Sequence, residues 1–408
     1  MIGTFFSILI AILLYFNELP AESIHNTNFL ALTMFLISTL FIITQTAVTI
    51  YAWIPLEKLE ENLTPRVVEA FRKDRNLKIT NIFLFLFLFF SYAIVVDLLF
   101  LGIFNKQSLF VIWTLFLGVA VDILHHHLKR VMEFLDPYQV MGFFNKSAQG
   151  CVRGEKEAEL CSWIDTFSEI SMKAIKKNST SLATLAVENL QMIAKNYLEA
   201  AKGITYHNEE DSKKFGGNDH VSYILFYLFQ RFELIFHKAL KEELEPLCSK
   251  VVTTLGKLSL YGAKYDISLM GYPIYYLGKL TARAQGQGMQ EVGNRAGLTL
   301  IEISKVIVQE VNLQYMEIKE PFITLINAMQ TIAKDSFRND KSINIRVLTK
   351  PFYDLKTLFQ SEKLQNHPDS PSIIHNLDAV IGEFTMLENV MSTIPPVAEI
   401  IKEREQKS

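Results

Sequence analysis

The sequence predicts an all-α membrane protein, with a four-span transmembrane helical domain followed by a cytosolic α-helical domain of solenoid or bundle type. The strongest observation is the apolar run Asn81 to Phe104, whose single charge is Asp97. Spanning a bilayer takes roughly 20 apolar residues, so this run is long enough. Beyond about residue 130 the chain becomes rich in charge, and its apolar residues recur with helical spacing and without strand-like alternation.

The charge distribution bears on the kind of partner, and the cysteines bear on the cellular compartment. The first 127 residues hold seven of the 40 Lys and Arg residues and nine of the 43 Asp and Glu residues. The remainder is therefore nearly neutral, and we expect no nucleic-acid partner, because phosphate binding requires a basic excess. Cys151, Cys161 and Cys248 form no C-x-x-C pair, which favours reduced thiols in the cytosol.

The predicted transmembrane domain covers residues 1–130, with helices over 1–17, 29–55, 81–104 and 109–135. The first helix is short for a full span. A cleaved signal peptide is the alternative, but the charged n-region of such a signal is missing, which favours a retained helix. The fourth helix continues into the cytoplasm until Asp136-Pro137, because proline disfavours helix at the residue before it.

The distribution of Lys and Arg predicts the orientation. The loop 57–80 carries six basic residues, and the segment Asn17 to Asn28 carries none. The positive-inside rule then places this loop and the C-terminal part in the cytoplasm. A short surface helix after Thr64-Pro65 would bring basic side chains to anionic head groups, and a solvated charged loop is the alternative. The expected head-group contacts are Arg66, Arg72, Lys73, Arg75, Lys78, Lys129 and Arg130.

Polar residues within the spans are candidate functional groups. Ser38, Gln45 and Thr49 share one helical face, which predicts either packing against another helix or a pore lining. Ionisable groups inside a membrane are costly, so Asp97 and Asp122 are functional candidates by default. They lie at different depths, and we do not expect them to share a proton.

Asp122 has two histidines on its own helical face. His125 and His126 follow it by three and four residues, a spacing that brings side chains together on a helix. Such a group could bind Zn²⁺ or relay protons. The alternative is that the histidines are polar anchors at the membrane boundary. No further ligand accompanies them, so we expect no metal and no cofactor.

The predicted cytosolic domain covers residues 154–397, after a connector at 131–153 and before a polar tail at 398–408. Its expected helices are 155–177, 181–202, 220–243, 246–264, 267–285, 290–314, 318–337, 342–364 and 371–392. Long helices with short links favour stacked antiparallel hairpins. An internal match at an offset of 110 residues supports stacking: Ile170, Ala174 and Leu190 correspond to Leu280, Ala284 and Leu300.

Val221 to Phe236 is the most apolar stretch of this domain, and its uninterrupted run is too short to span a bilayer. It predicts a buried core helix, or alternatively a surface helix resting on the membrane or on a sister subunit.

No catalytic motif is present, and Gly278-Lys279 lacks the glycine spacing of a phosphate-binding loop. We therefore expect a non-enzymatic scaffold that presents its helical domain at the inner leaflet, with the bilayer, a cytosolic protein and further copies of the chain as partners. A homo-oligomeric ion channel is the alternative, lined by Ser38, Gln45 and Thr49 or by Asp122. A proton- or metal-linked transporter using Asp97, Asp122, His125 and His126 is a weaker one.

Overall fold

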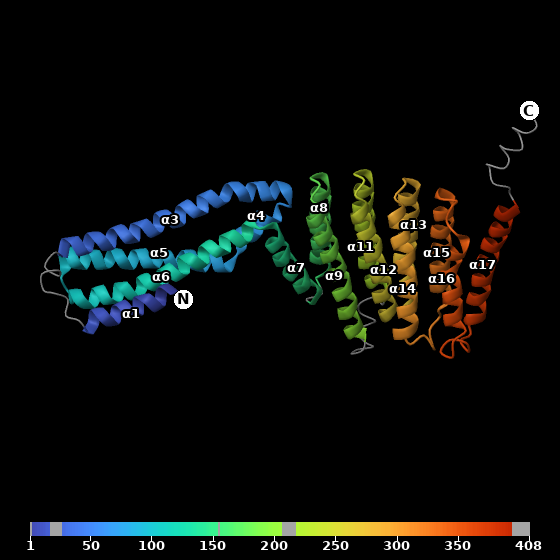
Figure 1. Cartoon of the computed structure of the whole chain (residues 1–408). Helices are drawn as coiled ribbons and strands as arrows, with labels where there is room; N and C mark the ends of the chain where they lie inside the picture. Colours follow the sequence, from blue (N-terminus) through green and yellow to red (C-terminus); the bar gives the residue numbers. More distant parts are fainter. Residues whose placement is uncertain (1, 17–26, 154–155, 206–217, 394–408) are drawn as a thin grey trace, which may run out of the picture. The chain divides into compact units, whose positions relative to one another are not determined.

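A computed structural model describes residues 2–16, 27–153, 156–205 and 218–393 of the chain. The described part is 88% helical, with 15 α-helices and no strands, which confirms the predicted all-α class. The chain forms two compact units, Met1–Phe143 and Phe144–Ser408 (Figure 1). The predicted tail at 398–408 lies outside the described residues.

The first unit consists mainly of long apolar helices. They are α1 (Ile2–Phe16), α3 (Thr27–Asn62), α4 (Arg66–Lys73), α5 (Arg75–Val96), the π-helical turn η1 (Asp97–Leu101), α6 (Lys106–Leu135) and the start of α7 (Pro137–Arg153). By length and composition, three of the described helices could cross a membrane: Asn28–Asn62, Arg75–Leu101 and Lys106–Leu135. The apolar helix at Gly3–Leu13 is shorter. As predicted, α6 ends just before Asp136-Pro137.

The segment 57–80, expected to contain either a short helix after Thr64-Pro65 or a solvated loop, is largely helical. The short helix occurs as α4, and the loop alternative is wrong. Pro55 removes one main-chain donor but does not end α3, which continues to Asn62. The extended α3 gives α4 a surface to pack on, so Val67 and Val68 are buried inside the unit and do not face a membrane surface. The connector expected at 131–153 is likewise helical, formed by the end of α6 and by α7.

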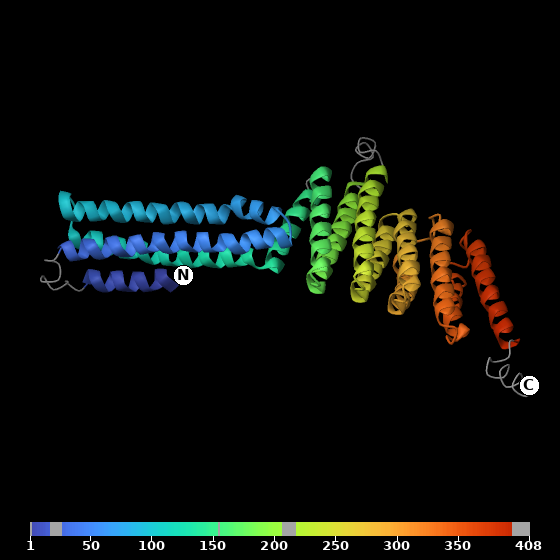
Figure 2. The ribbon, with the colours of Figure 1, turned by 90° about the horizontal axis from the view of Figure 1, so that it is seen from above.

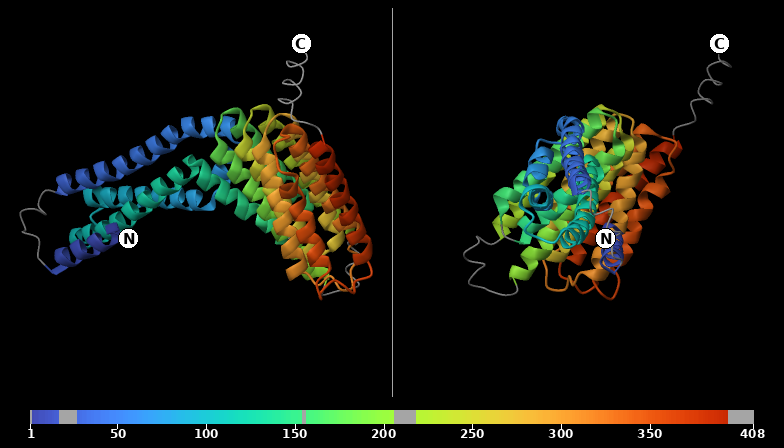
Figure 3. Two further views of the ribbon diagram at one scale, coloured as in Figure 1. Left: turned by 45° about the vertical axis from the view of Figure 1, so that its right-hand side comes forward. Right: turned by 90° about the vertical axis from the view of Figure 1, so that its left-hand side faces the viewer.

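Side chains from α3, α5, η1 and α6 meet in the core of the first unit. Met34, Ile94, Leu98 and Trp113 are buried against one another. The indole nitrogen of Trp113 donates a hydrogen bond to Ser91 Oγ at 3.0 Å, which satisfies the one polar atom of this ring. The long helices run side by side, as the end-on view shows (Figure 3). Outside this core, large apolar side chains of the same helices are exposed.

The second unit is a series of helical hairpins. Its helices are α8 (Glu157–Lys176), α9 (Thr180–Thr205), α11 (Asn218–Lys241), α12 (Glu245–Tyr265), the 3-10 turn η2 (Ile267–Met270), α13 (Gly271–Gly286), α14 (Gln290–Glu310), α15 (Lys319–Asn339), α16 (Ile345–Phe359) and α17 (Ser370–Thr393). Each predicted helix of this unit has a counterpart in the structure. The helix expected to begin at residue 267 starts with the 3-10 turn η2 and continues as α13.

The hairpins stack in two rows. One row contains α8, α11, α13, α15 and α17, and the other contains α9, α12, α14 and α16 (Figure 2). Each helix packs on its hairpin partner and on the equivalent helix of the next hairpin, so the unit is a solenoid and not a closed bundle. The run Val221 to Phe236 lies in α11 and is core on one side, although Tyr223 and Phe226 on that helix are exposed.

Three of the hairpins share the same turn. The backbone N–H groups of Ser179, Leu244 and Met289 donate to the carbonyls of Ala174, Ala239 and Ala284 at 2.9, 2.9 and 3.0 Å. This 6→1 bond, with a left-handed residue just before the donor, is a Schellman motif, which satisfies the carbonyls that a helix end leaves unpaired. The first and third turns are 110 residues apart, which accounts for the sequence match, and the middle copy is one that the match did not reveal.

The left-handed residue of the turn differs among the three copies, and this difference predicts their stabilities. Asn178, Glu243 and Gly288 have φ of 55°, 57° and 86°. A left-handed conformation costs a residue with a Cβ roughly 1–2 kcal/mol, whereas glycine adopts it freely. We therefore expect Gly288→Ala to speed hydrogen exchange of the α13 and α14 amides by about fivefold or more in the full-length protein. Conversely, Glu243→Gly should slow exchange in α11 and α12.

The control is Gly297→Ala in α14, a glycine without a positive φ and with no neighbour within 4 Å of an added Cβ. This substitution should preserve or increase protection, because alanine is the better helix former. Equal exchange in Gly288→Ala and Gly297→Ala would show that the turn does not limit the stability of the hairpin.

Candidate functional site

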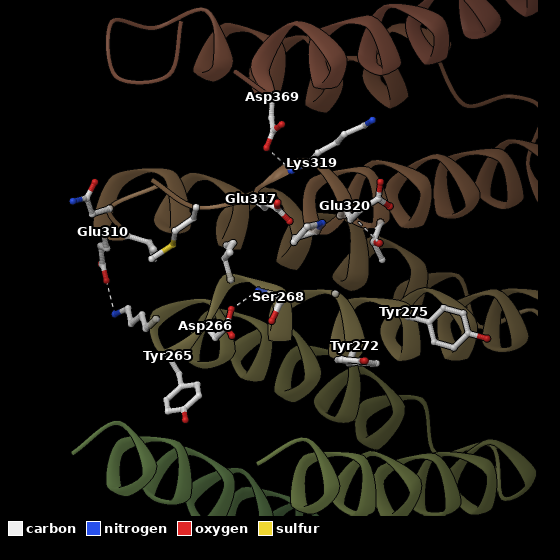
Figure 4. A pocket seen from close by; sticks show the side chains of 18 of the residues that line it. Tyr265, Asp266, Ser268, Tyr272, Tyr275, Glu310, Glu317, Lys319, Glu320 and Asp369 are labelled. Atoms are coloured by element: carbon white, nitrogen blue, oxygen red, sulfur yellow. Dashed lines mark hydrogen bonds and ion pairs between the residues drawn. The ribbon is translucent and has the colours of Figure 1, made fainter. Parts of the chain in front are cut away.

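A groove of about 1610 Å³ lies along the edge of the second unit where one hairpin passes to the next. Its lining comes from the end of α12, η2, the first turns of α13, the link from α14 to α15, and the residue before α17. Figure 4 shows Glu317 and Glu320 along one side of this groove and Tyr272 and Tyr275 along the other. The groove therefore joins residues of three successive hairpins and the start of α17.

Carboxylates at the helix starts form one structural element of the groove. Asp369 Oδ2 accepts hydrogen bonds from the backbone N–H groups of Ile318 and Lys319, at 3.0 and 3.2 Å, where α15 begins. Asp266 Oδ1 accepts from the N–H of Ser268 at 2.9 Å. These contacts satisfy donors that have no partner within the helix and complement the positive end of its dipole.

Aromatic side chains line the opposite side. Tyr272 and Tyr275 stand on α13 with 55% and 59% of their surface exposed, and Phe226 on α11 is 48% exposed. Tyr276 is instead buried, and burial raises the pKa of its phenol. Exposed tyrosines in a concave surface provide contact area with little conformational entropy to lose.

The groove carries net negative charge, because its lining holds five carboxylates and two lysines. Lys264 is paired with Glu310 at 2.5 Å. The side chains of Glu317 and Glu320 are exposed, and the described residues offer them no ion pair. The sequence does not mark this groove, because its residues come from hairpins that are far apart in the chain. The tyrosines at 272 and 275, spaced by three on a helix, were the one local signal.

Asp122, the candidate for metal binding, proton relay or a pore, contacts the start of α1. Its carboxylate oxygens accept hydrogen bonds from the backbone N–H groups of Gly3 and Thr4, both at 2.9 Å, and from Thr4 Oγ1. The first amides of a helix have no partner within the helix. Asp122 supplies such a partner, which gives this residue a structural role between α6 and α1.

Small residues bring α1 and α6 together one turn from this contact. A Cβ built on Gly118 would lie 1.8 Å from Ser7 Oγ and 2.7 Å from the Gly3 carbonyl oxygen. Only glycine therefore fits at position 118. Gly3 and Ser7 are spaced as in the small-x-x-x-small pattern that allows close helix packing in membranes.

Asp97 also bonds to backbone. It is 6% exposed and lies at the junction of α5 and η1, where its two oxygens accept from the N–H groups of Ile103 and Phe104 at 3.2 and 3.4 Å. Gly102, with φ of 61°, closes the π-helical turn by donating to the Asp97 carbonyl. The structure thus places Asp97 in the turn between α5 and α6, apart from the contact that Asp122 makes.

The histidines show no metal geometry. The described residues contain no group of three or more His, Cys, Asp or Glu side chains placed to hold a metal ion. His125 and His126 are exposed on α6, and Asp122 beside them is directed to α1. The buried histidine is the next one, His127, which is 2% exposed and whose ring nitrogens have no partner among the described residues.

The polar face of α3 meets the neighbouring helix α5. Gln45 Nε2 donates to Asn81 Oδ1 at 2.7 Å, and Thr49 Oγ1 donates to the carbonyl of Gln45 at 2.9 Å. Ser38 is fully buried. Of the three, Gln45 alone bonds across the interface; Thr49 bonds within α3, and the buried Ser38 Oγ has no hydrogen-bond partner among the described residues.

The predicted head-group contacts divide into two sets. Arg130 is held inside the first unit by Asp74 at 2.6 Å and Glu133 at 2.8 Å, with its guanidinium 4.3 Å from the Phe143 ring centre. Arg66 is half-buried at the start of α4. The other members are exposed: Arg72, Lys73, Arg75, Lys78 and Lys129. Lys73 also hydrogen-bonds Glu69 at 2.7 Å, which lowers the pKa of that carboxyl.

The close approach of α1 and α6 predicts that Gly118→Ala releases α1. A cysteine replacing Ala11, a residue of α1 that is 4% exposed, should then react with maleimide in the detergent-solubilised full-length protein. Losing a helix-end contact worth about 1–2 kcal/mol raises the open fraction by roughly fivefold to thirtyfold. Asp122→Ala should have the same effect. Gly142→Ala is the control, since nothing lies within 4 Å of an added Cβ there. Labelling of Gly118→Ala and Asp122→Ala that is no faster than that of Gly142→Ala would contradict the docking of α1 on α6.

Comparison with known proteins does not assign a family. No family model and no curated protein matches this chain. One solved structure with similarity is a circular tandem repeat protein with novel repeat topology and enhanced subunit contact surfaces. It has 14% sequence identity to this chain, covers 87% of this chain and 100% of its own length, and has a TM-score of 0.24.

Proposed function

We propose that this protein is a non-enzymatic multi-pass membrane scaffold. Its first unit anchors it in the bilayer, and its helical solenoid offers the groove at Tyr272, Tyr275, Glu317 and Glu320 to a protein partner in the cytoplasm. The observation that carries the proposal is this open groove on a hairpin array, in a chain that also contains three helices apolar enough to span a membrane. Solenoids characteristically bind partners along such extended surfaces.

The proposal includes α1 as a fourth membrane segment. At 15 residues α1 is about 22 Å long, shorter than the roughly 30 Å hydrocarbon core. Its N-terminal amides bond to Asp122 on α6, and its outward residues, including Phe5, Phe6, Leu9 and Leu13, are exposed and apolar. A helix that begins against an internal carboxylate can end inside the membrane without unpaired amides. This favours a retained helix over a cleaved signal.

The orientation follows from the basic residues. Arg72, Lys73, Arg75, Lys78 and Lys129 are exposed near the same end of the apolar helices. The positive-inside rule places this end, and with it the second unit, in the cytoplasm, where these side chains would meet anionic head groups.

Cysteine labelling tests this orientation. Ser108→Cys lies in the first turn of α6, and Lys177→Cys lies at the exposed tip of the α8–α9 hairpin. In intact cells, a membrane-impermeant maleimide should label position 108 and should reach position 177 only after permeabilisation. The unmodified chain is the control, because its three cysteines all lie in the second unit. Labelling of position 177 in intact cells would overturn the cytoplasmic placement.

Ion flux tests the scaffold against the channel alternative. Because Gln45 bonds to Asn81 and Asp122 bonds to α1, we expect no pore along either face. Proteoliposomes containing the full-length protein should therefore release a fluorescent or isotopic cation no faster than empty vesicles. Flux that is reduced by Gln45→Leu or Asp122→Asn would support a homo-oligomeric channel and remove the basis for the scaffold proposal.

A further inference from the structure

The groove has an aromatic surface that the chain leaves uncovered. Three other tyrosines of the second unit each have an Arg or Lys side chain of the same chain over the ring. The distances from the cationic group to the ring centre are 4.7 Å for Arg231 and Tyr227, 5.5 Å for Lys279 and Tyr276, and 5.7 Å for Lys195 and Tyr261. Within the described residues, no such cation covers Tyr272 or Tyr275. These two rings can therefore accept a cation from outside, because the face of an aromatic ring attracts positive charge.

The charged residues that line the groove favour a positively charged ligand. Glu317 and Glu320 face the tyrosines across the groove, and both are exposed (Figure 4). Of the two lysines in the lining, Lys264 is paired with Glu310, and Lys319 has no ion pair with the described residues. A ligand that enters the groove thus meets an excess of negative charge.

The position in the groove that best suits an anion, the N-terminus of α15, is already occupied by a carboxylate of the chain. Helix N-termini attract anions through their free amides. At the start of α15 these amides, from Ile318 and Lys319, are bound by the Asp369 carboxylate. A phosphate or acidic peptide would have to displace Asp369 and then remain close to Glu317 and Glu320.

We propose that the groove binds an Arg- or Lys-rich segment of a partner protein. The aliphatic stems of the segment lie on the rings of Tyr272 and Tyr275, and their charged heads reach Glu317 and Glu320. Tyrosine is a frequent anchor in such contacts, and charge complementarity sets the partner and speeds association. The volume of the groove, about 1610 Å³, accommodates several side chains of one segment. This inference rests on the proposed scaffold function and specifies the chemistry of its partner.

Peptide titration tests the chemistry directly. The full-length protein is placed in nanodiscs of phosphatidylcholine, whose neutral surface does not attract basic peptides. A short fluorescent peptide of alternating arginine and serine should bind with an affinity that falls as salt rises. The same peptide with glutamate in place of arginine should not bind. The double variant Tyr272→Ala/Tyr275→Ala should weaken binding by about tenfold, and Glu317→Gln/Glu320→Gln by a similar factor.

Matched variants outside the groove provide the controls. Glu302→Gln/Glu362→Gln removes the same charge from exposed positions elsewhere in the second unit, and Tyr353→Ala removes a half-exposed tyrosine of α16. Both should keep the affinity of the unmodified protein within about twofold. Equal affinity in the groove variants and these controls, absence of binding, or preference for the glutamate peptide would each overturn the inference.

Photo-crosslinking in cells separates this inference from the scaffold proposal. A photoreactive amino acid at position 272 should attach to a partner segment that mass spectrometry identifies as rich in Arg or Lys. Attachment to an acidic or apolar segment of another protein would overturn the basic-segment inference and leave the scaffold proposal standing. Attachment to a second copy of this chain would make the groove a self-association site. If no protein is attached at position 272, both the inference and the groove-based scaffold are wrong.

Discussion

Backbone amides at helix ends need hydrogen-bond partners, and this need explains many of the side-chain contacts in this structure. A helix leaves its first N–H groups and its last carbonyls without internal partners, and an unpaired buried group is costly. In the first unit, Asp122 bonds to the amides that begin α1, and Asp97 bonds to the amides of the turn after η1. These contacts satisfy amides that would otherwise have no partner, so the two carboxylates in apolar helices have a structural purpose.

The same constraint organises the solenoid. At one edge of the hairpins, three Schellman turns with alanine carbonyls at Ala174, Ala239 and Ala284 pair the last carbonyls of α8, α11 and α13. The three turns are alike, and the hairpins that they close pack on one another in chain order. At the links between hairpins, the caps are carboxylates, among them Asp266 and Asp369. The groove forms beside these links.

Polar residues that stand out in the sequence are therefore not the ones that form the open site. Gln45, Asp97 and Asp122 have their hydrogen bonds within the first unit. Arg130, which the sequence assigned to the head groups, is held by Asp74 and Glu133. The groove is instead lined by tyrosines and glutamates that no sequence pattern singles out. They form a site only because the fold places them on opposite sides of a concave surface.

The sequence by itself determined the helices and the apolar character of the N-terminal part. Helix boundaries depend on local chemistry, and Asp136-Pro137, Asn178-Ser179 and the glycines at 286–288 mark ends that the structure has. Uninterrupted apolar runs likewise identify the long helices of the first unit. The 110-residue match already indicated that one hairpin is repeated, because equivalent core positions carry similar residues.

Only the tertiary structure decided which helices meet and what their polar groups contact. Asp122 and Gly3 are 119 positions apart, and the groove unites residues from Phe226 to Asp369. No local pattern encodes such pairs, since they depend on how several helices pack together. For the same reason the sequence could place Val67 and Val68 on an apolar face but not say that the extension of α3 past Pro55 would bury them. Local propensity sets each helix, and packing sets the role of each polar side chain on it.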